Sequence, residues 1–420
     1  MFARPESESL GVAFAAEKIC LQRFDKSLIF LSKLLFMHQG LHSTVYPAAR
    51  LVSARLEKYF ARHFRESPDS DDQECAPVPD SDAIELMVDT AFWASLQREE
   101  RYTPKISLAF LAPEQDGERM MFEESLPLDP HALIKLSPAV ERPSIYLGVW
   151  RDSLGRLIVW GATRKVPQNC FVLEVVAPGL LVVKHRRARG SGKFANVLIL
   201  SGEQIKEIDE KGTSLADCPQ MLASMLRFGA SDQTDNRIDV LIQLAVSMRR
   251  HNRGGTLLIV PQQSGSWKES IISPARYTVT PVFTGLADLV RQEPVKADKR
   301  LHRELLFDAV EAVAGLTAVD GATVLNDEYQ LLAFGAKIKW RDNSAQVEQI
   351  IITEPVIGNQ PAIVHPVQFG GTRHLSAAQF VQDQQDSIAL VSSQDGRFTV
   401  FAWSPCEGLV HAHRVESMLL

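Results

Sequence analysis

The chain is 420 residues long, with 45% hydrophobic residues, 23% charged residues and a formal net charge of −6. This length predicts two or three domains with sizeable cores, and the ordinary composition excludes a collagen-like, coiled-coil or largely disordered chain. Neither half is rich in basic residues, so we expect no nucleic-acid-binding arm, and five cysteines without a CxxC pair indicate neither a disulfide framework nor a thiolate zinc site.

Residues 1–80 predict a helical segment followed by an acidic linker. The apolar stretch 28–41 is too short to span a bilayer, and the sequence start lacks the layout of a signal peptide, so we expect a cytoplasmic protein without a membrane span. The acidic, Pro-rich run 66–81 predicts the linker. An amphipathic helix is predicted over 47–64, and its apolar face comprises Leu51, Ala54, Phe60 and Phe64.

Residues 81–234 predict an α+β, strand-rich domain. A helix is expected over 81–98, and the basic run 184–193 predicts an exposed hairpin loop, because it lacks the spacing of a phosphate-binding loop. The Gly, Pro and Asn residues between the strand-like runs indicate a mainly antiparallel sheet. The predicted strands are 106–111, 120–124, 145–150, 157–162, 170–176, 180–184 and 196–201.

Residues 235–405 predict an α/β domain, a mixed sheet flanked by helices. The apolar run 256–261 is typical of a central strand buried on both faces. Small polar residues at 220–236 predict the domain boundary, and 406–420 is expected to be a tail with exposed His411 and His413. Further elements are predicted at 238–250 (helix), 277–282 (strand), 285–291 (helix) and 298–316 (helix with Leu301, Leu305, Ala309, Ala312 and Leu316 on one face).

Two motifs in this domain suggest nucleotide chemistry. Asp320-Gly321-Ala322 lies between a predicted helix and an apolar strand, where a carboxylate can coordinate a hard cation and a glycine leaves room for a ligand. A solvated Asp-Gly turn is the alternative. In the second motif, Gly371, Thr372, Arg373 and His374 precede a helix whose first amides favour anions, although the same residues also suit a simple capped helix start.

The order Asp-Gly-Ala, Gly-Thr-Arg-His and then Val391-Ser-Ser-Gln-Asp-Gly396 resembles the diadenylate cyclase family, of the DisA N-terminal type. The preceding residues are similar in arrangement to the sensor modules found before such domains. The resemblance implies that two ATP molecules are condensed into cyclic di-AMP, with Mg²⁺ or Mn²⁺, across two facing domains of a homodimer or higher oligomer. An unknown small-molecule or protein signal would act on the N-terminal domain.

The resemblance also implies individual roles. Asp320 would hold the metal and help to activate the attacking ribose hydroxyl. The nucleotide would be bound by Gly321, Ala322, Gly371, Thr372, Arg373 and His374, with Arg373 and His374 also serving catalysis.

Two positions depart from the family pattern. Leu375 stands where the pattern has a second arginine, and Ser393 stands where it has an acidic residue that Asp395 or Glu407 would have to replace. The segment 337–365 between the motifs is long and predicts an extra hairpin. The alternatives are therefore an active cyclase, a catalytically degenerate module that binds ATP or a cyclic dinucleotide, and an interaction scaffold.

Overall fold

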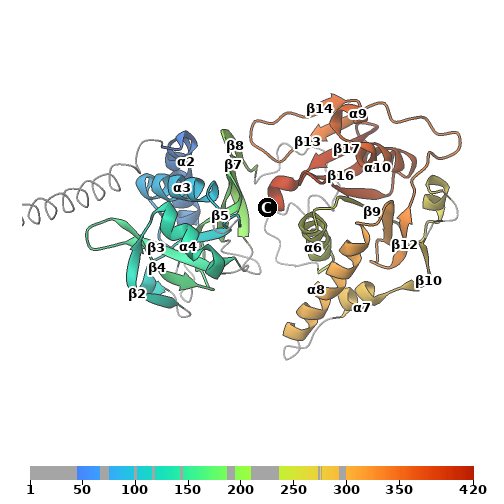
Figure 1. Ribbon diagram of the computed structural model, residues 1–420. Helices are drawn as coiled ribbons and strands as arrows, with labels where there is room; N and C mark the ends of the chain where they lie inside the picture. The colour runs from blue at the N-terminus through green and yellow to red at the C-terminus, as the bar shows by residue number, and fades with distance from the viewer. Residues whose placement is uncertain are drawn as a thin grey trace, which may run out of the picture.

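The structure is a computed structural model, and its two units lie side by side (Figure 1). We call residues 45–209 the N-terminal unit and residues 236–420 the C-terminal unit. The structure describes residues 45–66, 75–98, 102–115, 119–141, 145–186, 194–209, 236–272, 275, 277–292 and 299–420. The apolar stretch 28–41, residues 67–74 of the linker, the basic loop beyond Arg186 and the boundary near 220–235 lie outside these residues.

The N-terminal unit is built on an eight-stranded sheet in the order β2-β4-β3-β1-β5-β6-β7-β8. Only β1 and β3 pair in parallel, so the predicted antiparallel character is confirmed for the described strands. The strands are β1 (Ile106–Phe110), β2 (Met120–Pro127), β3 (Tyr146–Arg151), β4 (Leu157–Thr163), β5 (Phe171–Ala177), β6 (Leu180–Arg186), β7 (Phe194–Ser201) and β8 (Gln204–Glu207).

One face of this sheet packs against the helices α2 (Pro47–Glu66), α3 (Ser81–Ser95) and α4 (Pro130–Val140). Asp80 begins α3 by accepting a hydrogen bond from the Ala83 amide at 2.8 Å, and Asp129 caps α4 in the same way. The short 3₁₀ helix η1 (Pro113–Gln115) follows β1. The opposite face holds a smaller cluster around Trp160, whose indole donates to the Leu111 carbonyl at 2.7 Å.

The C-terminal unit contains a nine-stranded mixed sheet in the order β10-β12-β11-β9-β15-β16-β17-β13-β14. Its central strand β9 (Gly255–Val260) is buried at every position, as the apolar run predicted. The other strands are β10 (Tyr277–Phe283), β11 (Ala322–Asn326), β12 (Leu331–Ala336), β13 (Ile350–Thr353), β14 (Ala362–Val364), β15 (Ile388–Ser392), β16 (Phe398–Ser404) and β17 (Leu409–Arg414).

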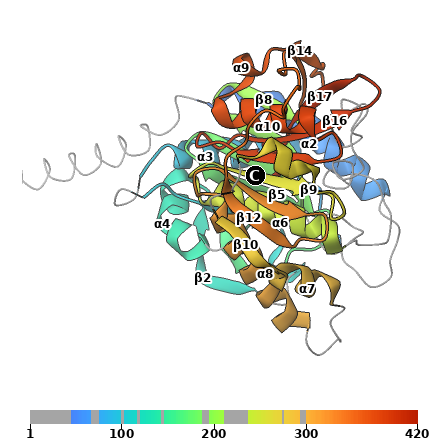
Figure 2. The same ribbon diagram turned by 90° about the vertical axis from the view of Figure 1, so that its right-hand side faces the viewer.

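Helices cover both faces of this sheet. One face packs against α6 (Asn236–Arg250), α7 (Gly285–Arg291) and α8 (Lys299–Leu316), and the other packs against α10 (Thr372–Asp383) and the 3₁₀ helix η2 (Ser266–Ser270). The short helix α9 (Pro366–Phe369) precedes α10, and η3 (Glu416–Met418) follows β17. Figures 1 and 2 show α7 and α8 at one end of the unit and α9 with β14 at the other.

Two predicted helix faces are wrong in part. In α2, Leu51 and Phe64 are 64% and 45% exposed, whereas Val52, Leu56 and Phe60 are buried. In α8, Leu301, Leu305 and Ala312 are exposed, and the buried residues are Val310, Val313 and Ala314. Both helices carry apolar residues at helical spacing on more than one face, so packing against the neighbouring elements decides which face is buried.

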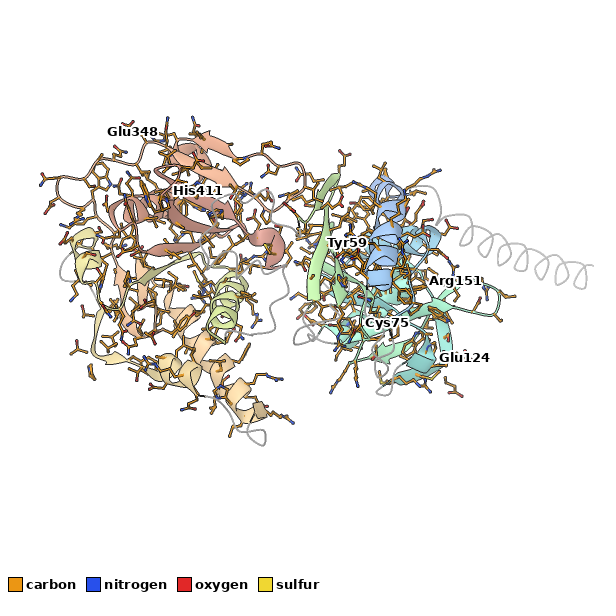
Figure 3. The ribbon with its side chains drawn as sticks, turned by 180° about the vertical axis from the view of Figure 1, so that it is seen from behind. Tyr59, Cys75, Glu124, Arg151, Glu348 and His411 are labelled. Carbon is orange, nitrogen blue, oxygen red and sulfur yellow. The ribbon has the colours of Figure 1, made fainter. Side chains whose placement is uncertain are left out.

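The expected tail after residue 405 contains an interior strand. β17 lies between β16 and β13, so His411 and His413 are 4% and 0% exposed, which corrects the prediction that both are exposed. Figure 3 labels His411 within the C-terminal unit. The His413 ring contacts the Thr353 hydroxyl at 2.6 Å. The hairpin predicted within 337–365 is present as β13 and β14, which pair in antiparallel fashion.

Candidate functional site

Asp320 lies in the turn between α8 and β11. Its side chain is 86% exposed and forms an ion pair with Lys337, the residue after β12. The two residues meet because β12 runs antiparallel to β11, with Ala336 opposite Ala322. The Asp320 carboxylate is therefore presented to solvent at the point where β11 begins.

Gly321 is required by the backbone of this turn. Its φ is +117°, and a Cβ atom at this position would lie 2.5 Å from the carbonyl carbon of Gly335. Only glycine tolerates both the positive φ and so close an approach to β12. Ala322 follows with 2% exposure and packs in the core, so the two residues fix the direction in which Asp320 leaves the sheet.

The second motif forms the start of α10. Gly371 is the N-cap residue, and Thr372 and Arg373 are exposed on the first turn. The Arg373 guanidinium extends toward Gly254, because a Cβ atom on Gly254 would lie 3.0 Å from its Nη1. The φ of Gly254 is +71°, so this position also favours glycine.

The register of the sheet brings the two motifs to one edge. β9 pairs in parallel with β11, with Thr256 opposite Ala322, and in antiparallel fashion with β15, with Gly255 opposite Ser392. Gly254 therefore lies between the turn that carries Asp320 and the end of β15. We call this end of the sheet, where these strands begin or finish, the motif edge. In spatial order across the strands, its residues are Lys337, Asp320, Gly254, Ser393, Arg397, Arg414 and Glu354.

His374 is buried beneath the start of α10. Its ring packs edge-on against Phe369 and Phe401, with centroids 5.4 and 6.0 Å apart, and a Cβ atom on Gly370 would overlap it. Burial lowers the pKa of His374, and the nearby cations of Arg397 and Arg373 lower it further. At neutral pH the imidazole is therefore neutral, so it can donate or accept a hydrogen bond but adds no charge to the site.

Three arginines that the sequence reasoning did not select also lie at the motif edge. Arg249, at the end of α6, donates to the Gly396 carbonyl at 3.1 Å, and Arg397 forms an ion pair with Asp395 at 3.2 Å. The carbonyl of Arg253 accepts from the Gln394 amide at 3.4 Å. The turn 393–397 is thus held against the end of α6. In the sequence, the basic run before Gly254-Gly255 pointed to Arg249 and Arg253, but such a run is also typical of an ordinary helix C-terminus.

The residues that depart from the family pattern have distinct positions. Leu375 is half-buried and packs against the core beneath α10. Ser393 and Asp395 lie in the turn after β15, at the motif edge, whereas Glu407 lies in the turn after β16, at the opposite edge of the sheet. Of the two carboxylates considered as replacements, only Asp395 shares an edge with Asp320.

A divalent cation would have Asp320 as its carboxylate ligand here. Among the residues that the structure describes, no group of three or more His, Cys, Asp or Glu side chains is arranged to hold a metal ion. Magnesium in nucleotide sites is commonly held by one or two carboxylates together with substrate phosphates and waters. Asp320 could serve as one such carboxylate ligand only if Lys337 were displaced from it.

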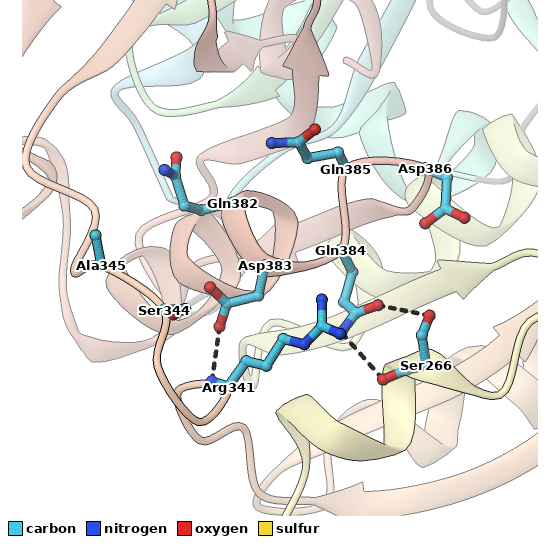
Figure 4. A pocket seen from close by; sticks show the side chains of 9 residues that line it. All are labelled: Ser266, Arg341, Ser344, Ala345, Gln382, Asp383, Gln384, Gln385 and Asp386. Carbon is cyan, nitrogen blue, oxygen red and sulfur yellow. Dashed lines mark hydrogen bonds between the residues drawn. The ribbon is translucent and has the colours of Figure 1, made fainter.

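A pocket of about 540 Å³ lies at the other end of α10, and none of the motif residues lines it (Figure 4). Its lining is polar: Gln384 bonds to Ser266, and the Arg341 amide donates to Asp383. Trp267 is 6% exposed and packs in the nearby core. This pocket is separate from the motif edge, because α10 begins at one edge of the sheet and ends at the other.

A match to a known family lies in the N-terminal unit. Residues 73–164 match the family described as "Probable sensor domain DACNV", a region that runs from just before α3 to the end of β4. The chain thus carries a region similar to a sensor domain, as expected, and the match lies outside the C-terminal unit. No curated protein matches the chain.

Among solved structures, a hypothetical membrane spanning protein from Bacillus cereus is similar, with 13% sequence identity and a TM-score of 0.24. The similarity covers 41% of this chain and 61% of that one, so this chain spans less than two thirds of its length. In the part of the chain described by the structure, no helix is long and apolar enough to cross a bilayer.

Proposed function

We propose that the C-terminal unit binds ATP at the motif edge and condenses two ATP molecules into cyclic di-AMP, and that the N-terminal unit regulates this reaction. The observation that carries the proposal is the placement of Asp320 and Arg373 on either side of Gly254, although the two residues lie in separate parts of the sequence. A carboxylate that could hold a metal and a guanidinium that could hold a phosphate then lie at the same end of the sheet.

The chemistry requires an acceptor for a proton and cations for the phosphates. In each of two steps, a ribose hydroxyl attacks the α-phosphorus of the other ATP, the new P–O bond forms, and the bond to pyrophosphate breaks. Asp320 would accept the hydroxyl proton and hold the cation, while Arg373 and the first amides of α10 would neutralise phosphate charge. Positioning and charge neutralisation supply most of the catalysis in such transfers, so no covalent nucleophile is needed.

The exposure of the site supports a reaction between two copies. Asp320, Thr372 and Arg373 are all exposed on one open edge, and each ATP needs the ribose hydroxyl of the other. A second copy facing this edge would bring the two nucleotides together and exclude water from both. The active form would then be a homodimer, at least while ATP is bound.

A nucleotide-binding module without turnover is the second candidate. Two observations favour it: Leu375 packs in the core instead of offering a further phosphate ligand, and Lys337 occupies the Asp320 carboxylate. Such a module would bind ATP or a cyclic dinucleotide as a signal.

The test is incubation of the full chain with ATP and Mn²⁺ or Mg²⁺, with the product identified by mass spectrometry. We expect cyclic di-AMP from the wild type and none from Asp320→Asn. The same substitution at Asp386, an exposed residue at the opposite edge of the sheet, should leave product formation intact. A rise in melting temperature with ATP but no product would favour the binding module, and the absence of both would overturn the nucleotide assignment.

A further inference from the structure

The two units are joined at the end of the motif edge where β13 finishes. Ile208, just after β8, forms an antiparallel bridge with Val356. The Asp209 amide donates to the Pro355 carbonyl at 3.0 Å, so the chain of the N-terminal unit pairs directly with the segment that follows β13. The junction therefore includes backbone pairing between the segment after β8 and the segment after β13.

Two side chains of the N-terminal sheet reach across this junction. Lys206 on β8 forms an ion pair with Glu354 at 2.6 Å, and the Glu354 side chain is only 11% exposed. Asn196 on β7 donates to the carbonyls of Ser417 and Leu420 at 2.9 and 3.3 Å. Lys206 and Asn196 are held in regular strands, so a shift of β7 or β8 would move their partners in the C-terminal unit.

Both contacts lead to Arg414, the last residue of β17. Its Nη1 lies 4.0 Å from Glu354, the partner of Lys206. Its Nη2 bonds at 2.5 Å to Glu416, which directly precedes Ser417, the partner of Asn196. The contact of Lys206 thus leads to Glu354 and the contact of Asn196 leads to Glu416, and both carboxylates bind the Arg414 guanidinium.

Arg414 in turn lies beside the candidate site. It is opposite Thr399 in the β16–β17 register, two residues beyond Arg397, and its charge contributes to the environment of His374. Glu416 also interacts electrostatically with Arg249, the arginine that donates to the Gly396 carbonyl. The charge of Arg414 therefore acts on His374 at the start of α10, and the charge of Glu416 acts on Arg249, which holds the turn 393–397 through Gly396.

We infer that Arg414 is a positioning residue through which the N-terminal unit controls the motif edge: the contacts of Lys206 and Asn196 set the position of Arg414, and Arg414 sets the order of the turn 393–397 and of the α10 start. The identity of the ligand at this edge rests on the proposed function, but the coupling between the N-terminal unit and the motif edge does not. A signal that shifts β7 or β8 would loosen or tighten the site without touching it.

Hydrogen exchange on the full chain tests the coupling without any ligand. Lys206→Met should speed amide exchange at residues 371–376 and 393–397 by about two- to five-fold, the range expected from losing a partly exposed ion pair. The matched control is Lys184→Met, which breaks a 2.6 Å ion pair with Glu174 inside the N-terminal sheet. Unchanged exchange in Lys206→Met, or an equal effect in Lys184→Met, would overturn the inference.

A double-mutant cycle tests the route through Arg414. Adding Lys206→Met to Arg414→Gln should change exchange at the motif edge no further than Arg414→Gln alone, whereas fully additive effects would contradict a shared route. If Arg414→Gln does not fold, Arg414→Lys takes its place, because lysine keeps the positive charge but lacks the planar fork with which Arg414 contacts two carboxylates. ATP affinity of the same variants is measured in parallel: a wild type that binds no ATP would defeat the proposed function, while the exchange results still decide the coupling.

Discussion

Gly321 shows how a single residue can serve the fold and the site together. Replacement by alanine would force a Cβ atom to within 2.5 Å of the Gly335 backbone at a φ of +117°. We expect Gly321→Ala to lower the free energy of unfolding by about 2–4 kcal/mol, from strain and overpacking combined. The control is Gly315→Ala in α8, where a Cβ atom meets nothing within 4 Å, and where alanine should be neutral or stabilising by up to about 1 kcal/mol. Urea unfolding of both variants checks this, and equal effects would refute the close approach.

His374 predicts a pH dependence of stability. Burial lowers its pKa below the ordinary value of 6.5, followed by the effects of Arg397 and Arg373, against an opposing effect of Asp395. Below about pH 6.5 the unfolded chain therefore takes up a proton that the folded chain does not, and the free energy of unfolding falls until the pH reaches the folded pKa.

The variant His374→Gln should have a shallower loss of stability between pH 7.5 and pH 5.5 than the wild type, as measured by urea unfolding. His251, whose pKa burial also lowers, should leave part of the slope in place. His131→Gln removes an exposed imidazole and serves as the control. Identical slopes in the wild type and His374→Gln would show that the buried ring does not stay neutral.

At the level of elements, α8 tests which helix face carries the packing. Val310 is 1% exposed against α6 and the sheet, whereas Leu301 is 58% exposed. Val310→Ala should therefore cost about 1–3 kcal/mol of unfolding free energy, and Leu301→Ala should stay within about 0.5 kcal/mol of the wild type. Thermal or urea unfolding separates the two. A larger loss at Leu301 would mean that this face is covered by a partner or by another part of the chain.

The elements that the sequence predicts correctly are those with local signals. The strands between residues 106 and 201 and the run 256–260 appear where predicted, because turn residues and apolar runs are local signals. The helix α4 was missed, since Pro138 lies within it and proline argues against a helix interior. The apolar face of α8 was misassigned because Leu305, Leu306 and Phe307 follow one another, so that either face reads as amphipathic.

The sequence can predict which residues belong to the site but not how they are arranged. Asp320 and Arg373 could be selected from their motifs, yet their shared edge depends on the pairing of β9 with both β11 and β15, which is a long-range property. For the same reason the sequence predicts a tail for His411 and His413: nothing local shows that β17 is enclosed by β16 and β13. The arginines at 249, 253 and 397 become part of the site only through the register.

At the level of the whole molecule, the proposed reaction depends on two copies. If each Asp320 activates one ribose hydroxyl, a dimer of one wild-type and one Asp320→Asn chain can form the first P–O bond but cannot close the ring. A ten-fold excess of Asp320→Asn over a fixed amount of wild type should then reduce cyclic di-AMP by about ten-fold, provided that the dimers exchange freely. The linear dinucleotide should accumulate in its place, and mass spectrometry distinguishes the two products.

The matched addition is Asp386→Asn in the same excess, which carries an intact motif edge and should raise the yield instead of lowering it. This pair of mixtures separates a shared reaction from simple dilution, because both added chains have the same size and charge. A yield that excess Asp320→Asn leaves equal to that of the wild type alone would contradict a face-to-face mechanism and would place both bond-forming steps within one chain. The open, exposed edge that carries Asp320 and Arg373 argues for the shared reaction, since one copy alone leaves its nucleotide accessible to water.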